Sequence, residues 1–257
     1  NISFNGTVSA GAGSKGAERS LIVEAANGTV TFNDQVGGSL VASRDPFETR
    51  SWSSYAGNQD TNPWAVDVTA SRINLYADVT TFETQTYNGP AWVGNNGSNG
   101  NTRLLVSLDP AITFTDTIDD VDGSHTLIAK AISADGSQEP SYDFQGDIGS
   151  QRALAGFFAE AGRQDVSANV ADIDISDLTR ENPDLFTGTG TISGNIITTG
   201  DLGLIARDIV FDPVEGRDLV TLDHGGLLTI TTGLPAPGQP VSDAQIESFN
   251  KLNRIER

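Results

Sequence analysis

The densest group of residues able to do chemistry in this 257-residue chain is an acidic turn, DTIDDVDGSH. Hard cations such as Ca²⁺ are bound by several oxygen ligands, and this turn offers the carboxylates of Asp116, Asp119, Asp120 and Asp122. Ile118 stands two residues before Asp120, where the EF-hand pattern requires an acidic residue, and the Gly-Gly-x-Gly-x-Asp pattern of calcium β-rolls is absent. The pattern therefore favours a solvated acidic turn. A Ca²⁺ site is the alternative, and no other cofactor is indicated.

Known catalytic motifs are absent from the sequence. It contains no nucleophile elbow, no HExxH, no P-loop and no catalytic-triad pattern. Paired carboxylates are used in glycoside hydrolysis, but among 34 acidic residues a chosen pair carries little information. The two histidines, His125 and His224, lie in turn-like stretches, where we expect surface side chains. We therefore expect no enzyme activity, with a carbohydrate-active enzyme built on a β-helix as one alternative.

Aromatic residues in polar stretches are candidates for recognition. The stretch 44–63 is polar and contains Phe47, Trp52 and Tyr55, while Trp92 lies in a Gly/Asn-rich stretch at 90–103. Inserted surface loops on rigid scaffolds often carry binding residues, so these aromatics could bind a surface glycan or a protein receptor. The alternative is that they fold back and cover the scaffold.

A repeated phrase defines the elements that would position these residues. Each copy has a β-branched and aromatic run, a turn, and then a run of Leu, Ile, Val and Ala; the aromatic positions are Phe4, Phe32, Tyr87, Phe114 and Phe144. Their spacing indicates a repeat of about 27 residues, with further copies expected near 66–75 and 166–175, and such a period is typical of solenoids. Alternating apolar residues in runs of this composition predict strands. The sequence thus predicts an all-β fold, a right-handed parallel β-helix.

The boundaries of this domain follow from breaks in the repeat. We expect it to span 1–233, with loop insertions at 44–63, 90–103 and 177–187. The Ala-rich stretch 150–166 aligns with the apolar runs of other copies, so we predict a strand there. Prolines end the pattern at 234–240. A capping box then predicts a short C-terminal amphipathic helix with the apolar residues Ile246, Phe249, Leu252 and Ile255. This helix would cap the last rung or contact a following domain or partner.

The phrases also resemble a known family. TQTYNG, GTVTFNDQVGG, AITFTDTID and GNIITTGDLGLIA are similar to the repeats of filamentous-haemagglutinin-type bacterial exoproteins, which are exported by two-partner secretion. The resemblance implies a β-helix shaft at the cell surface, with roles in adhesion, aggregation or carrying other domains. Since the chain opens inside a repeat, we expect a segment of a longer protein. The alternative is a repeating subunit of an extracellular filament or surface layer, whose partners would be copies of itself.

Composition agrees with these expectations. The chain has no Cys, which excludes disulfides and thiolate metal sites. Its formal net charge of −19 would repel nucleic acid and anionic lipid. No apolar run is long enough to span a membrane. We therefore expect an extracellular or cell-surface protein with neither nucleic-acid binding nor membrane insertion.

Overall fold

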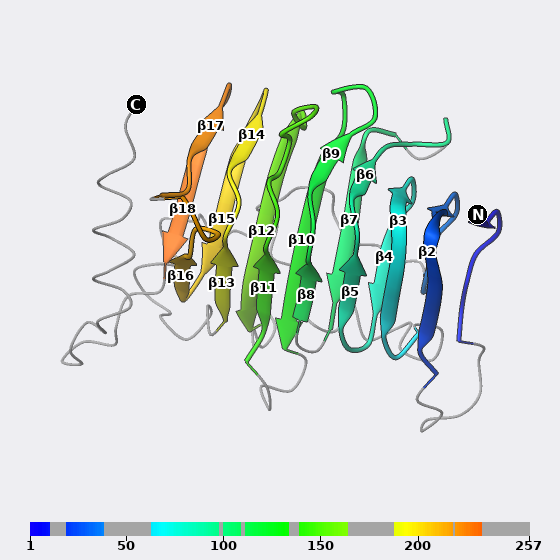
Figure 1. Ribbon diagram of the computed structural model, residues 1–257. Helices are drawn as coiled ribbons and strands as arrows, with labels where there is room; N and C mark the ends of the chain where they lie inside the picture. The colour runs from blue at the N-terminus through cyan, green and yellow to red at the C-terminus, as the bar shows by residue number, and fades with distance from the viewer. Residues whose placement is uncertain are drawn as a thin grey trace.

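The computed structural model describes residues 1–10, 19–38, 63–97, 100–108, 111–133, 139–163, 188–217 and 219–232. Every regular element in these ranges is a strand, as the β-branched and aromatic composition of the phrases predicts (Figure 1). The strands are β1 (Ile2–Phe4), β2 (Leu21–Phe32), β3 (Val66–Leu75), β4 (Val79–Thr81), β5 (Gln85–Asn88), β6 (Ala91–Val93), β7 (Thr102–Ser107), β8 (Ala111–Phe114), β9 (Ile118–Asp120), β10 (Thr126–Ser133), β11 (Ser141–Phe144), β12 (Gly156–Arg163), β13 (Thr189–Ile192), β14 (Ile196–Thr198), β15 (Leu202–Ala206), β16 (Asp208–Phe211), β17 (Leu222–His224) and β18 (Leu228–Thr232).

The strands pair in parallel and form three rows. The first row contains the N-terminal halves of β2 and β3, then β5, β8, β11, β13 and β16. The second row contains β1, the C-terminal halves of β2 and β3, then β6, β9, β14 and β17, with single bridges at Ile148 continuing it from β9 to β14. The third row is the six-stranded sheet β4–β7–β10–β12–β15–β18.

The chain visits the three rows in a constant order. It passes through β5, β6 and β7, then β8, β9 and β10, and each strand pairs with its equivalent in the next repeat (Figure 1). This arrangement of long parallel sheets is compatible with a parallel β-helix.

The strand register confirms the predicted aromatic repeat only in part. Phe4 and Phe32 lie in the second row, whereas Tyr87, Phe114 and Phe144 lie in the first, where the β3 residue in register with Tyr87 is Val68. Phe4 pairs with Phe32, and Tyr87 pairs with Phe114, which pairs with Phe144. Their rings stack, with centroid separations of 5.1 Å for Phe4 and Phe32, 4.5 Å for Tyr87 and Phe114, and 5.7 Å for Phe114 and Phe144. Equivalent aromatic residues therefore form stacks inside the core, where offset rings attract one another.

One of the two additional copies is confirmed, and the other lies outside the described residues. The copy near 66–75 is β3, which pairs with β2 on one side and with β5 and β6 on the other. The copy outside the described residues is the one near 166–175. Among the described strands, β11 pairs directly with β13 and β12 directly with β15.

The repeat length is not a constant 27 residues, as the sequence predicted, but differs from one repeat to the next. Ile192 of β13 pairs with Phe211 of β16, only 19 residues later. Corners in this repeat are short: a single residue, Arg207, separates β15 from β16. Longer repeats contain longer third-row strands, such as β10, and additional corner residues, because only the stacked positions are constrained by pairing.

Three further expectations concern the loops and the C-terminus. Part of the predicted loop at 90–103 is strand: β6 begins at Ala91, and β7 begins at Thr102. The predicted strand within 150–166 is confirmed as β12, which pairs with β10. The expected loop at 177–187 and the C-terminal segment 234–257, with its predicted helix, lie outside the described residues.

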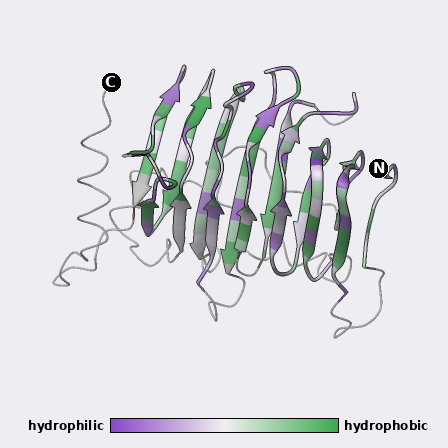
Figure 2. Cartoon of the chain, viewed as in Figure 1, coloured by the Kyte–Doolittle hydropathy of each residue, from purple (hydrophilic) through white to green (hydrophobic). Residues whose placement is uncertain are grey.

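The core lies between the rows, where inward positions alternate with exposed ones. In β8 and β11 the second and fourth residues are buried and the first and third are half-buried, as alternation along a strand requires. Figure 2 shows the same interleaving of hydrophobic and hydrophilic positions along the strands. One apolar cluster accordingly runs through the whole stack, from Val23 to Leu222.

From β7 to β12 the third row is buried on both faces. A second apolar cluster contains residues that alternate with the core residues of β7, β10 and β12, namely Leu104, Val106, Leu108, Ile128, Ile132 and Phe158. This explains why the sequence reads RLLVSL and HTLIAKAI there, without alternation, since strands buried on both faces are apolar throughout.

Candidate functional site

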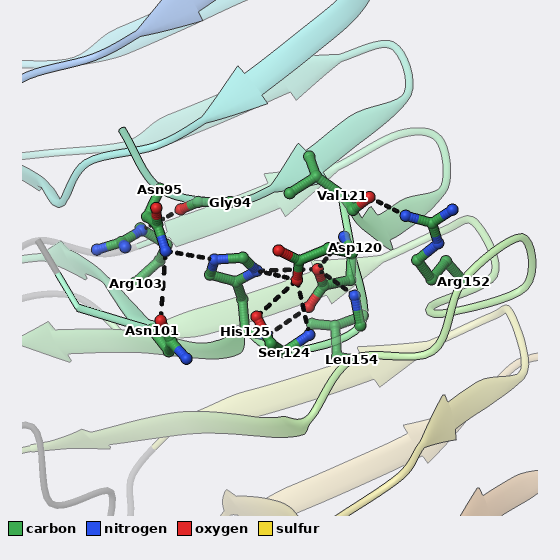
Figure 3. Close-up of polar contacts among 12 residues, drawn as sticks. Gly94, Asn95, Asn101, Arg103, Asp120, Val121, Ser124, His125, Arg152 and Leu154 are labelled. Atoms are coloured by element: carbon green, nitrogen blue, oxygen red, sulfur yellow. Dashed lines mark hydrogen bonds and ion pairs between the residues drawn. The ribbon is translucent and has the colours of Figure 1, made fainter. Parts of the chain in front are cut away.

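The acidic turn lies at the corner between β9 and β10 and is built around Asp120. Asp120 is fully buried. Its Oδ1 accepts backbone N–H groups from Asp122 at 2.9 Å and Gly123 at 2.8 Å, and its Oδ2 accepts the N–H of His125 at 2.6 Å (Figure 3). Gly123 has a φ of +87°, a conformation that side chains other than glycine rarely adopt. The carboxylate therefore satisfies the backbone donors of a tight turn.

His125 is buried beside this carboxylate, rather than on the surface as the sequence suggested. Its Nδ1 lies 2.9 Å from Asp120 Oδ1 and 3.2 Å from Asp122 Oδ1. Its Nε2 lies 2.8 Å from Nδ2 of Asn95, between the carboxylate and the amide in Figure 3. The side-chain amide of Asn95 is oriented by its oxygen, because Oδ1 accepts the backbone N–H of Gly97 at 2.9 Å and Nδ2 therefore faces His125. We infer that Nε2 accepts a hydrogen bond and that the proton sits on Nδ1 and is donated to Asp120.

The four predicted cation ligands do not converge on one point. The Oδ1 of Asp116 accepts the neighbouring N–H of Thr117 at 2.7 Å. The Oδ1 of Asp119 accepts the N–H groups of Gln151 at 2.7 Å and Arg152 at 3.1 Å, while its buried Oδ2 has no hydrogen-bond partner in the part of the chain that the structure describes. Alternation along β9 separates Asp119 from Asp120, which lie on opposite faces of the strand.

Asp120 and Asp122 are brought together, and His125 joins them. One ligand atom from each of the three residues lies within 4.8 Å of the others. Each already has a hydrogen-bond partner within the turn: the Oδ1 of Asp122 accepts the N–H and the hydroxyl of Ser124, at 3.0 Å and 2.6 Å. The hydrogen bond from the Ser124 hydroxyl is the main cause that lowers the pKa of Asp122. The arrangement is a hydrogen-bonded turn, but it is not the solvated acidic turn that the sequence favoured, because Asp119 and Asp120 are fully buried and accept backbone N–H groups.

Arg103 is a buried cation at the neighbouring corner, between β6 and β7. Its guanidinium donates to backbone carbonyl oxygens, from Nε to Gly94 at 2.5 Å, from Nη1 to Thr102 at 2.8 Å and from Nη2 to Gly100. Asp78 lies 4.0 Å away. Buried carbonyl groups in an irregular loop need donors, and a guanidinium supplies five. Sequence reasoning missed this role, although a charged residue opening an apolar run after a Gly/Asn-rich loop was a usable signal.

Among the predicted recognition residues, Trp92 is the one that the structure describes. It is half-buried on the outer side of β6, in register with Asn74 on one side and Asp119 on the other. The guanidinium carbon of Arg72 lies 4.3 Å from the centre of the Trp92 ring, a cation–π contact. Phe47, Trp52 and Tyr55 lie outside the described residues, in the connection between Gly38 and β3, as do the C-terminal residues Ile246, Phe249, Leu252 and Ile255.

A continuous polar surface follows the outer side of the first row, and the sequence reasoning did not identify it. Five outward residues on five consecutive strands are in register, namely Asp67, Thr86, Thr113, Asp143 and Thr191. All five are half-buried or exposed. The signal was present in the polar residue that precedes each core aromatic, as in QTYN, AITF and SYDF. We call these five residues the polar row.

Comparison with family models, curated proteins and solved structures finds no significant match to this chain. None of the described residues belongs to a helix long and apolar enough to cross a membrane. A functional interpretation therefore rests on the stacked parallel strands and on the surfaces that they present.

Proposed function

We propose that this chain is a structural and adhesive shaft segment of a large bacterial exoprotein, located at the cell surface. In this proposal the three rows close into a right-handed parallel β-helix, which attaches the cell to a surface or carries other domains of a longer polypeptide. The family resemblance of the repeated phrases supports the proposal.

The observation that carries the proposal is the in-register stacking of equivalent phrases. In the first row each strand pairs in parallel with its equivalent from the neighbouring repeat, from β2 to β16. Each repeat then contacts mainly its neighbours, so the fold extends in one direction and can lengthen by adding repeats. Such a design suits a stiff spacer that presents surfaces along its length.

A glycan-array screen, combined with an assay for sugar release, tests the adhesive function. The intact chain and a Trp52→Ala/Tyr55→Ala variant are compared on a glycan array, and released reducing ends are measured in parallel. Binding without release of reducing ends supports an adhesin, and loss of binding in a variant of unchanged circular dichroism assigns recognition to the 44–63 loop. Catalytic release of sugar would overturn the proposal in favour of the carbohydrate-active enzyme.

A second candidate, a filament subunit, is favoured by the two ends of the stack. Among the described residues, no strand pairs with the outer edge of β1, where Ile2 is 36% exposed. Near the opposite end Leu227 is 63% exposed. Open strand edges with exposed apolar residues can pair with another copy. Sedimentation velocity over a range of concentrations distinguishes the two functions, because a filament subunit assembles as concentration rises and a shaft segment stays monomeric.

A further inference from the structure

We propose that the polar row is a binding surface for an extended, neutral polysaccharide. This inference deepens the proposed adhesive function and rests on it. The surface is defined by the outward residues Asp67, Thr86, Thr113, Asp143 and Thr191, whose strands pair in parallel and in register.

The side chains of the polar row are available to a ligand. No hydrogen bond within the described residues uses the hydroxyl group of Thr86, Thr113 or Thr191, and none of these residues is buried. The two carboxylates each accept one side-chain amide, Asp67 from Asn88 at 3.2 Å and Asp143 from Gln145 at 2.8 Å. Each carboxylate keeps further acceptor capacity, because an ionised carboxylate offers about four lone-pair sites.

Residues beside the polar row continue the same chemistry. Thr69 and Asn88 pair next to Asp67 and Thr86, and Ser141 pairs with Thr189 next to Asp143 and Thr191. The surface is therefore several residues wide, rich in hydroxyl groups, and without an aromatic or a cationic side chain in the row itself.

This chemistry selects the class of ligand. Threonine hydroxyls both donate and accept hydrogen bonds, as sugar hydroxyls do, and the carboxylates accept from sugar hydroxyls. An anionic polymer would be repelled by the two carboxylates and by the net charge of −19. The polar row itself contains no apolar side chain, and the exposed Ile22 of β2 flanks it at one end. A neutral, hydroxyl-rich polymer fits these groups best.

The other outer surfaces differ in ways that single out the first row. From β7 to β12 the outer side of the third row is largely apolar and buried, for example at Val106 and Ile128, and its charged residues Lys130 and Glu160 form an ion pair with each other. In the second row, Trp92 is contacted by Arg72 and the neighbouring Asp119 is fully buried. Only the first row presents polar side chains over five consecutive strands in the described part of the chain.

The geometry predicts weak contacts that accumulate along a polymer. Neighbouring strands lie about 4.8 Å apart, so the polar row offers hydrogen-bonding groups at regular steps along a line, as the rings of an extended polysaccharide do. Each exposed hydrogen bond contributes little on its own. Binding should therefore increase strongly with ligand length and be undetectable for a single sugar.

Affinity electrophoresis tests the proposal with a soluble, unbranched β-glucan cast in the gel. The intact chain is compared with Thr113→Val/Thr191→Val, which removes two hydroxyls and keeps β-branched side chains suited to strands. We expect the dissociation constant of the variant to rise about tenfold. The control is Thr229→Val, on the half-buried position of β18 in the third row, with circular dichroism to verify folding of all three proteins.

The outcomes separate this inference from the proposed function. Retardation that is lost in Thr113→Val/Thr191→Val, kept in Thr229→Val, and stronger for long than for short glucans supports the polar row. Glucan binding that is equal in all three proteins overturns the inference and leaves an adhesive function intact. Equal or stronger retardation by the anionic polymer alginate also overturns it, because the carboxylates should repel alginate. Release of reducing ends would contradict the proposed function itself.

Discussion

At the scale of single residues, two buried tyrosines of the first row differ in one hydrogen bond. Tyr87 and Tyr142 both lie in first-row strands with at most 1% of their surface exposed. The hydroxyl of Tyr87 donates to Oε1 of Gln85 at 2.9 Å, whereas the hydroxyl of Tyr142 has no hydrogen-bond partner among the described residues. Burial raises the pKa of both hydroxyls far above the ordinary range, so both stay protonated.

Phenylalanine substitutions should therefore have opposite effects at the two positions. Tyr142→Phe removes a buried, unpaired hydroxyl and is expected to leave stability unchanged or raise it by about 1 kcal/mol. Tyr87→Phe leaves Gln85 Oε1 without that donor and should lower the free energy of unfolding by about 1–2 kcal/mol. Urea denaturation of both variants measures the difference. A loss for Tyr142→Phe as large as that for Tyr87→Phe would contradict this account.

At the scale of elements, side chains at one corner join successive repeats. The Oδ1 of Asp147, which follows β11, accepts the N–H of Asn195 at 2.8 Å, and the Oδ1 of Asn195 accepts the N–H of Thr221 at 2.9 Å. Arg217 also binds both oxygens of Asp147, with Nη2 at 2.9 Å from Oδ2. The corner is thus held by side chains from three consecutive repeats, in addition to strand pairing.

This corner should contribute to the pH dependence of stability. The hydrogen bond from Arg217 is the main cause that lowers the pKa of Asp147, with the backbone N–H of Asn195 adding to it. Because the pKa is lower in the folded state, the stabilisation is present above the unfolded pKa, about 3.9, and is lost as pH falls through the folded value.

The corresponding experiment compares urea unfolding of the intact chain and Asp147→Asn between neutral and acidic pH. The intact chain should be the more stable of the two at neutral pH, and the gap should shrink as the pH falls below about 4. Asp223→Asn, at an exposed position of β17, controls for the loss of one negative charge. A gap that stays constant down to the lowest pH would refute the role of this carboxylate.

At the scale of the whole molecule, electrostatic repulsion is the dominant consequence of composition. A net charge of −19 acts against the compact state. At about 0.15 M salt, interactions between exposed charges are largely screened beyond roughly 8 Å. Added NaCl should therefore stabilise the fold until screening is nearly complete.

Unfolding midpoints in urea, measured over a series of NaCl concentrations, test this prediction, and the midpoint should rise with salt. CaCl₂ at equal ionic strength serves as the comparison. Equal effects of the two salts agree with screening alone. A larger effect of CaCl₂ that disappears in an Asp122→Asn variant would instead identify a bound cation at the β9–β10 corner. A midpoint that does not change with NaCl would contradict the repulsion argument.

The sequence by itself determined the strands, their repeat and the residues that face the core. Phe4 with Phe32, and Tyr87 with Phe114 and Phe144, could be aligned from spacing and type alone, because stacked repeats place equivalent side chains at equivalent positions. The alignment of Phe32 with Tyr87 was wrong, since the two residues lie in different rows. The unbroken apolar runs of β7 and β10 likewise carried the signal of strands buried on both faces.

Only the tertiary structure decided which repeats are neighbours and which polar atoms meet. It placed β13 directly beside β11, buried His125 between Asp120 and Asn95, and aligned the five residues of the polar row. Periodicity depends on short-range spacing along one strand, whereas these contacts join residues tens of positions apart. Their partners are set by the lengths of the corners between strands, and a degenerate repeat leaves those lengths free to vary.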